Sequence, residues 1–169
     1  MLITMEMTFI TTGGTIDGAN SDTGALRDSS SAAEWLGHQA GLKINHIALM
    51  NKDSRQITDD DRMRIVQTVA GAKTDRILIG HGTFSICDTG RLLKKELPNT
   101  DKTILLVGAW IPFNNPSSDA ENQMLFALER LHEGKPGIFV AMDQQLWNPD
   151  TTEKKMTGPN TYRLTTITS

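Results

Sequence analysis

Short apolar runs alternate along this chain with segments of helical pattern, and this alternation limits its possible folds more than any other feature. Runs of strand length occupy residues 7–10, 43–50, 76–80, 103–109 and 137–142. Helical patterns lie between them at residues 32–40, 58–69, 85–97 and 118–131. Because strands that alternate with helices pair in parallel, and right-handed crossovers place helices on both faces, we expect a covered sheet. The sequence therefore predicts an α/β fold, with three α/β/α layers and a mostly parallel, doubly wound sheet of the flavodoxin or Rossmann type.

The ends of several elements carry their own signals. Thr58 precedes three aspartates at 59–61, and hydroxyl caps and early acidic residues both favour a helix N-terminus. We interpret these aspartates as a solvated helix end rather than a metal site. Ser118 and Glu121 have the spacing of a capping box, which predicts the start of the last helix. Residues 162–168 alternate weakly between apolar and polar side chains, as an edge strand does.

Length and composition bound the class of protein. The 169 residues suit one domain with one sizeable core, and we expect residues 1–169 to form a single domain. A net charge of −3 provides no basic surface for nucleic acid or for an anionic membrane. No apolar run approaches the roughly 20 residues that a membrane span needs, and the N-terminus lacks the shape of a signal peptide. Cys87, the only cysteine, lies in a predicted helix as a buried inert thiol and fits a reducing, cytoplasmic environment.

The first apolar run ends in residues 12–15 (Thr-Gly-Gly-Thr), which form the first candidate site. Two glycines let the backbone turn sharply and approach a ligand, and open α/β sheets bind ligands where their strands end. Residues 81–83 (His-Gly-Thr) follow the third run in the same way. If the two junctions lie side by side, the hydroxyls of Thr15 and Thr83 converge. The first junction matches neither the dinucleotide-binding nor the P-loop pattern, and most strand–Gly–Gly turns bind nothing, so a purely structural turn is the alternative.

Several hydroxyls near a lysine suggest nucleophilic hydrolysis, in which a threonine needs a base or a lowered pKa to attack. His81 can titrate near neutral pH, but a structural histidine at the end of a strand is the favoured interpretation over a catalytic base. The other histidines lack the spacing of metal ligands, and we expect no metal site; they are His38, His46 and His132.

Three segments resemble the signatures of the bacterial-type L-asparaginases, in the same order and at similar spacing. They are residues 12–16 (Thr-Gly-Gly-Thr-Ile), 81–83 (His-Gly-Thr) and 107–109 (Val-Gly-Ala). Residues 117–122 resemble the S-A-D-G-x-N stretch that follows the third signature in this family. The resemblance covers nearly the whole chain but only the N-terminal domain of the family. It implies a single asparaginase-like N-terminal α/β domain over residues 1–169, with the C-terminal asparaginase domain absent, as in short-chain asparaginases.

The resemblance implies an amidohydrolase that converts L-asparagine, or a related amide, to the acid and ammonia without a metal or organic cofactor. By this resemblance Thr15 is the nucleophile, and water releases the product from an acyl-threonine ester. Thr83 handles protons together with a lysine that arrives late in the chain. Lys154 fits the position of that lysine best, and Lys155 is the second choice.

The resemblance also implies where the substrate is held. Ser54 resembles the substrate-holding serine of the family, and backbone donors near Ala109 and the glycines are expected to stabilise the oxyanion. The expected substrate contacts are Gly14, Asp53, Ser54, Gly82, Phe84 and Ala109.

Two departures from the family pattern bear on catalysis. Phe84 and Ser85 stand where the family has an aspartate and a threonine, and that aspartate binds the α-amino group of the substrate and pairs with the lysine. An aromatic ring attracts a cation through its face, but it accepts no proton. Phe84 has a second interpretation, as a core residue of a helix in a shifted register. The family also carries a lid tyrosine near positions 25–30, whereas the only tyrosine here is Tyr162, so Thr23 is one candidate to serve instead.

The sequence supports three functional hypotheses. The first is an active amidohydrolase of asparaginase type, and the second is a catalytically impaired relative that binds a small amide or amino acid as a sensor or regulatory module. The third is an unrelated flavodoxin-like domain, for which Thr15 and Thr83 would lie far apart. A chain without the second domain is expected to form a homodimer or higher homo-oligomer, and residues 110–113 (Trp-Ile-Pro-Phe) are a candidate apolar rim or subunit contact.

Overall fold

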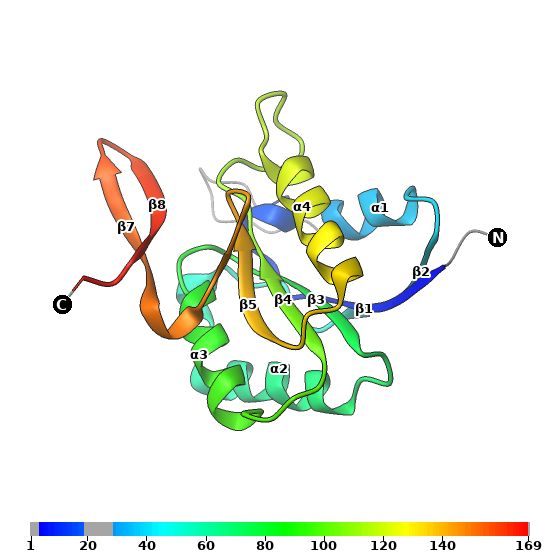
Figure 1. Cartoon of the computed structure of the whole chain (residues 1–169). Helices are drawn as coiled ribbons and strands as arrows, with labels where there is room; N and C mark the ends of the chain where they lie inside the picture. Colours follow the sequence, from blue (N-terminus) through cyan, green and yellow to red (C-terminus); the bar gives the residue numbers. More distant parts are fainter. Residues whose placement is uncertain (1–3, 19–28, 169) are drawn as a thin grey trace.

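A mostly parallel sheet forms the centre of the molecule. The computed structural model describes residues 4–18 and 29–168. Within these residues, one sheet contains β1 (Met5–Thr11), β2 (Leu42–Ala48), β3 (Arg76–Gly80), β4 (Thr103–Val107), β5 (Gly137–Met142) and β6 (Gln145–Trp147). Their order across the sheet is β2-β1-β3-β4-β5-β6, in which the first five are parallel and β6 runs antiparallel to β5 (Figure 1). The five predicted strands are confirmed.

Helices cover both faces of this sheet. They are α1 (Ser31–Gly37), α2 (Asp59–Gly71), α3 (Ile86–Glu96) and α4 (Ala120–Glu133). Helices α1 and α4 lie on one face, and α2 and α3 lie on the other (Figure 1). The predicted three-layer α/β fold is therefore confirmed. No helix among the described residues is long and apolar enough to cross a membrane.

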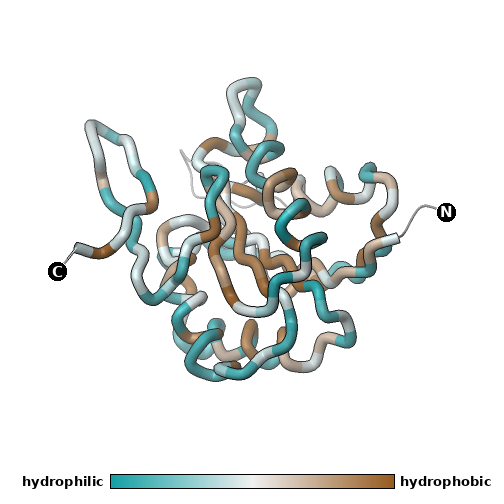
Figure 2. The backbone as a smooth tube through the Cα atoms, viewed as in Figure 1, coloured by the Kyte–Doolittle hydropathy of each residue, from teal (hydrophilic) through white to brown (hydrophobic). Residues whose placement is uncertain are grey.

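Each face of the sheet has its own hydrophobic core, because successive strand residues point to opposite faces. Leu105 and Val107 of β4 pack with side chains of α1 and α4, whereas Ile104 and Leu106 pack with those of α2 and α3. Every residue of β4 is buried. Burial on both faces explains why the central strands β3 and β4 are nearly continuous apolar runs, and Figure 2 shows this hydrophobic centre of the molecule.

The helix start at Thr58 forms as predicted. The Thr58 hydroxyl accepts from the Asp61 amide at 3.2 Å, and the Asp61 carboxylate accepts from the Thr58 amide at 3.0 Å, which makes a capping box. The interpretation as a solvated helix end is wrong for Asp61, because this side chain is buried and its carboxylate also accepts from Lys52 Nζ at 2.6 Å. These hydrogen bonds, above all the one from Lys52, lower the pKa of Asp61 to about 2. Asp59 is exposed, as predicted.

The capping box predicted at Ser118 and Glu121 is wrong. Asp119 is the residue before α4, and the Ser118 hydroxyl accepts from the Ala120 amide at 3.0 Å. The Glu121 carboxylate accepts from Trp35 Nε1 of α1 at 3.1 Å. A contact between two helices on the same face of the sheet thus replaces the local contact that the spacing indicated.

Beyond β5 the chain forms a hairpin that the sequence did not predict. Strands β7 (Thr152–Gly158) and β8 (Thr161–Thr166) pair with each other in a separate two-stranded sheet (Figure 1). The predicted final strand exists, but it pairs with β7 and not with the edge of the main sheet. Leu164 of β8 is buried in the core of the α2–α3 face, and Arg91 of α3 donates to the Thr152 carbonyl at 2.6 Å. Because an isolated hairpin is marginally stable in water, these contacts hold it in place.

Candidate active site

The candidate site lies at the ends of β1 and β3, which are neighbours in the sheet although β2 separates them in the sequence. The chain leaves β1 toward α1 on one face and leaves β3 toward α3 on the other face. A crevice opens at such a switch point, and ligands of α/β proteins bind there. Residues 12–15 follow β1 and residues 81–83 follow β3, so the fold places both Gly–Thr junctions at this point.

Gly14 and Gly82 bring the two junctions into contact. A Cβ atom built on Gly14 would lie 2.5 Å from the Gly82 Cα, closer than real side chains come. Gly14 also has φ 86° and ψ −176°, a backbone conformation open essentially to glycine alone. Thr15 and Thr83 therefore stand on adjacent loops, which argues against the hypothesis of an unrelated domain.

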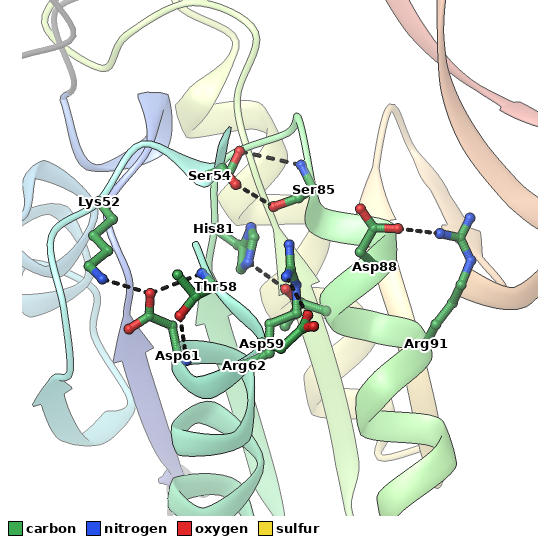
Figure 3. A network of polar contacts seen from close by, with 11 residues as sticks. Lys52, Ser54, Thr58, Asp59, Asp61, Arg62, His81, Ser85, Asp88 and Arg91 are labelled. Carbon is green, nitrogen blue, oxygen red and sulfur yellow. Dashed lines mark hydrogen bonds and ion pairs between the residues drawn. The ribbon is translucent and has the colours of Figure 1, made fainter. Parts of the chain in front are cut away.

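Ser54 lies against the second junction. It opens a short 3₁₀ turn, and a Cβ built on Gly82 would lie 2.6 Å from its hydroxyl oxygen. That oxygen accepts from the Ser85 amide at 3.3 Å, and the Ser85 hydroxyl donates to the Ser54 carbonyl at 2.6 Å (Figure 3). Ser54 is buried, so these contacts join its loop to the start of α3.

Asp53 has a partner that the sequence interpretation missed. Its carboxylate accepts from Arg55 Nε at 3.0 Å and also from Arg55 Nη2, and hydrogen bonding to this guanidinium lowers the pKa of Asp53. The charge of Lys154 lowers the same pKa further. A substrate group at Asp53 would therefore share the carboxylate with Arg55. The only signal in the sequence was the Asp-x-Arg spacing, which is too common to identify an ion pair.

Lys154 reaches the site from β7. Its Nζ donates to the Thr83 hydroxyl oxygen at 2.9 Å. Lys155 is exposed, because neighbouring strand residues point to opposite sides, so the first choice and not the second meets Thr83. Burial lowers the pKa of Lys154, the positive charge of Arg55 adds to this effect, and Asp53 opposes it. A lowered pKa raises the share of neutral amine, which can accept a proton.

Phe84 lies in the turn before α3 and points outward. The side chain is 60% exposed, so its interpretation as a core residue of a helix is wrong. The ring centroid lies 5.5 Å from Lys154 Nζ, within the range of a cation–π contact. The amine thus has an aromatic face beside it at the position where the family has a carboxylate.

His81 is fully buried, and both of its ring nitrogens have partners. Nδ1 donates to the Gly82 carbonyl at 2.8 Å, because a carbonyl oxygen only accepts, and Nε2 then accepts from the Thr89 hydroxyl at 2.8 Å. Burial lowers the pKa of His81 to about 4. The ring is therefore neutral at pH 7, in agreement with its interpretation as a structural histidine. Figure 3 shows its place within the network of polar contacts.

The third signature segment packs on the second. A Cβ built on Gly108 would lie 2.9 Å from the His81 carbonyl oxygen and 3.0 Å from Thr83 Cγ2. Ala109, the next residue, is buried. All three signature segments therefore meet at one edge of the sheet.

Asp17 braces the first junction, a role that the sequence did not reveal. Its side chain is buried, and its carboxylate accepts from the Gly13 amide at 3.1 Å and from the Ser30 hydroxyl. Ser30 in turn caps α1 by accepting from the Ala33 amide at 3.0 Å. Burial raises the pKa of Asp17 to about 6, although both hydrogen bonds act in the opposite direction.

Replacement of Asp17 by asparagine is expected to change how stability depends on pH. The pKa of about 6 exceeds the ordinary value of 3.8, so the folded protein binds more protons than the unfolded chain between these values. The contribution of Asp17 to stability is therefore complete below about pH 4 and is lost as the pH rises through 6. We compare the unfolding free energy of Asp17→Asn with that of the wild type at pH 4 and at pH 7. The difference should shift in favour of the variant by about 2–3 kcal/mol from the lower pH to the higher.

Urea unfolding at both pH values measures this gain. An asparagine amide can accept from Gly13 and donate to Ser30, so the brace itself is expected to remain in the variant. A constant difference in unfolding free energy between Asp17→Asn and the wild type across this pH range would contradict the prediction.

Some predicted features fall outside or at the margin of this site. Thr23, the candidate substitute for the lid tyrosine, lies outside the described residues. Trp110 and Phe113 of the predicted rim are partly exposed, and Phe113 packs near the Trp35 ring. In the part of the chain that the structure describes, no group of three His, Cys, Asp or Glu side chains is placed to hold a metal ion.

Comparison with known sequences identifies similar proteins. The chain matches the family described as "Asparaginase, N-terminal" over residues 6–165. It is 30% identical over 166 residues to the L-asparaginase of Thermococcus kodakarensis. The aligned region covers 94% of this chain and 51% of that protein. It is 28% identical over 148 residues to a glutamyl-tRNA(Gln) amidotransferase subunit from Methanopyrus kandleri. That aligned region covers 81% of this chain and 32% of that protein.

Comparison with solved structures gives the same fold. The thermostable L-asparaginase from Thermococcus kodakarensis has a TM-score of 0.80 at 29% identity, over 94% of this chain and 51% of that chain. L-asparaginase I from Vibrio cholerae has a TM-score of 0.78 at 20% identity, over 96% and 51%, which shows likeness of fold alone. The chain spans about half or less of the length of these relatives. Since the family match extends over most of its length, this chain belongs to the asparaginase family, whose N-terminal domain it matches.

Proposed function

We propose that this chain is an asparaginase-like amidohydrolase, which hydrolyses L-asparagine or a related amide to the acid and ammonia. The observation that carries the proposal is the 2.9 Å hydrogen bond between Lys154 Nζ and the Thr83 hydroxyl, beside the loop of Thr15. A hydroxyl bonded to an amine of lowered pKa suits the proton transfers of acyl chemistry. Membership of the asparaginase family supports the reaction class.

In the proposed reaction the Thr15 hydroxyl oxygen attacks the amide carbon of the substrate and forms an acyl-threonine ester. Neutral Lys154 takes the proton through the Thr83 hydroxyl and returns it to the leaving nitrogen, so that ammonia departs. Water then hydrolyses the ester and releases the acid. We assign the oxyanion to backbone donors around Gly14 and Ala109, and we propose no metal or organic cofactor.

Ammonia release from L-asparagine, L-glutamine and a panel of simple amides tests this proposal. Release by the wild-type protein would support it and would rank the substrates by kcat/KM. Absence of release from every amide, from protein whose folded state is verified by circular dichroism, would refute it.

A second candidate function is that of a catalytically impaired relative that binds a small amide or amino acid as a sensor or regulatory module. The exposed ring of Phe84 favours this candidate, because a ring accepts no proton and forms no charge-assisted hydrogen bond. Similarity to a protein named as one subunit of an amidotransferase favours a role beside a partner protein. A rise in Tm with L-asparagine or L-aspartate, without ammonia release, would support this second function.

Substitution of Phe84 by aspartate is expected to lower KM for L-asparagine about 5- to 30-fold, because a carboxylate there gives the substrate ammonium an anionic partner worth roughly 1–2 kcal/mol. The exposed position predicts a stability change within about 0.5 kcal/mol. KM for an amide of equal size without the α-ammonium group should not fall. The control variant Phe84→Asn removes the ring without adding charge, and an equal drop in KM for Phe84→Asn would contradict the electrostatic explanation.

The proposal extends to assembly and location. We propose a homodimer or higher homo-oligomer in the cytoplasm, with a small-molecule amide as substrate and neither nucleic acid nor membrane as partner. Burial raises the pKa of Cys87 to about 11, which suits an unreactive thiol in a reducing compartment. Sedimentation velocity of the purified chain measures the oligomeric state, and a monomer at micromolar concentration would refute the assembly.

A further inference from the structure

Three aromatic rings surround the ammonium group of Lys154. Its Nζ lies 4.7 Å from the ring centroid of Tyr162, 5.5 Å from that of Phe84 and 5.6 Å from that of Trp110. All three distances are within the roughly 6 Å range of a cation–π contact. The rings come from three separate segments, namely β8, the turn before α3 and the loop after β4. A site with rings from three segments is a feature of the folded molecule, which no local sequence pattern indicates.

The hairpin places Tyr162 on the same side as Lys154. Lys154 of β7 pairs with Leu164 of β8, and Tyr162 is two residues before Leu164, so both side chains of β8 share the face of Lys154. The diagonal distance across two strands is within reach of a long and an aromatic side chain. Because Leu164 is buried in the core of the domain, this face of the hairpin packs toward the site at Leu164 and Lys154, and Tyr162, which is 36% exposed, stands at its margin. Lys155 is exposed.

The charged side chains near Lys154 do not supply an unpaired carboxylate for its ammonium group. Among the described residues, the charged side chains that act on it are Arg55, which disfavours its ammonium form, and Asp53, which favours it. The Asp53 carboxylate is already bonded to the Arg55 guanidinium. Lys154 donates to Thr83, and the three rings then supply the attraction that a free carboxylate would give to a half-buried ammonium.

We infer that Tyr162 is a positioning residue: its ring, with those of Trp110 and Phe84, holds the Lys154 ammonium against the Thr83 hydroxyl. The C-terminal hairpin thus supplies both the amine and one of the rings that orient it. The catalytic meaning of this contact rests on the proposed function, but the contact itself does not. We place Tyr162 in contact with Lys154 and assign it no contact with the substrate.

A pH titration of the side-chain signal of Lys154 by NMR tests the inference without any turnover. The signal is assigned by its loss in Lys154→Arg. In Tyr162→Leu, which keeps an apolar cover and removes the π face, we expect the pKa of Lys154 to fall by about 0.4–0.7. In Tyr162→Phe, which keeps the π face, we expect no change. Tyr162→Met, another apolar cover without a ring, replaces the leucine variant if that variant fails to fold.

The alternatives give different results in the same titration. An unchanged pKa of Lys154 in Tyr162→Leu, or an equal fall in Tyr162→Phe, would overturn the inference. A rise in Tyr162→Leu would also overturn it, because the ring would then act by excluding water from the ammonium. If the protein releases ammonia, Tyr162→Leu should lower kcat several-fold with KM nearly unchanged, because the loss of the amine's position at the Thr83 hydroxyl outweighs the larger share of neutral amine. Tyr162→Phe should keep the wild-type kcat. If the wild type releases none, the proposed function fails and the titration still decides the role of Tyr162.

Discussion

Replacement of Thr15 by alanine is expected to lower kcat/KM for ammonia release at least about 10³-fold, because the acyl-threonine ester cannot form without the hydroxyl. The unfolding free energy should change little. Thr15 opens a short 3₁₀ turn whose position is set by its neighbours, Gly14 and the Asp17 carboxylate that accepts from Gly13. Assays of ammonia release with purified wild type and Thr15→Ala, at the same pH, measure the ratio.

Two further variants separate the roles of the threonines. Thr15→Ser keeps a hydroxyl at the same position and should retain measurable ammonia release. Thr83→Ala removes the group that links Lys154 to the reaction, and general acid–base roles of this kind contribute about 10²–10⁴-fold. If Thr15→Ala stays active while Thr83→Ala loses all release, the assignment of the nucleophile is wrong and Thr83 becomes the candidate.

The central strands of the main sheet were predictable because they are buried on both faces. Residues 76–80 and 103–107 carry almost only apolar side chains, so their pattern needs no knowledge of distant contacts. The hairpin of β7 and β8 has the opposite character. Most of its side chains are exposed or half-buried, and only Thr152 and Leu164 are buried, so the sequence carries little periodic signal there.

In the candidate site, too, some features follow from local sequence patterns and others only from contacts between elements. The Gly–Thr junctions after β1 and β3 could be placed at the same edge, because parallel strands end there, but that β1 and β3 are neighbours came from the structure. The contacts that tune the site could not be placed, because each joins side chains of different structural elements whose relative placement the sequence pattern does not give. Asp17 meets Ser30, and Lys154 meets Tyr162 across a hairpin whose pairing the sequence did not show. Roles for these residues depend on side-chain geometry, which only the folded structure provides.

The contact between the two junctions makes Gly14 intolerant of a side chain. Gly14→Ala is expected to lower the unfolding free energy by about 3 kcal/mol or more, since the φ and ψ of this residue alone cost a non-glycine residue about 1–3 kcal/mol. The added methyl group would also lie 2.5 Å from the Gly82 Cα and 2.6 Å from the Gly82 nitrogen, and backbone atoms cannot move aside as a flexible side chain does. For a chain of this size, Tm should fall by about 6–12 °C or more.

Gly71→Ala is the matched control for this loss. Gly71 lies at the end of α2, and a Cβ there would meet nothing within 4 Å, so we expect an unchanged or slightly raised Tm. Differential scanning calorimetry of both variants measures the contrast, and a Tm of Gly14→Ala within about 2 °C of the wild type would contradict the close contact. Any folded Gly14→Ala protein must separate residue 14 from residue 82. Because Thr15 and Thr83 follow these two glycines, such a variant should also lose ammonia release, whereas Gly71→Ala should retain it.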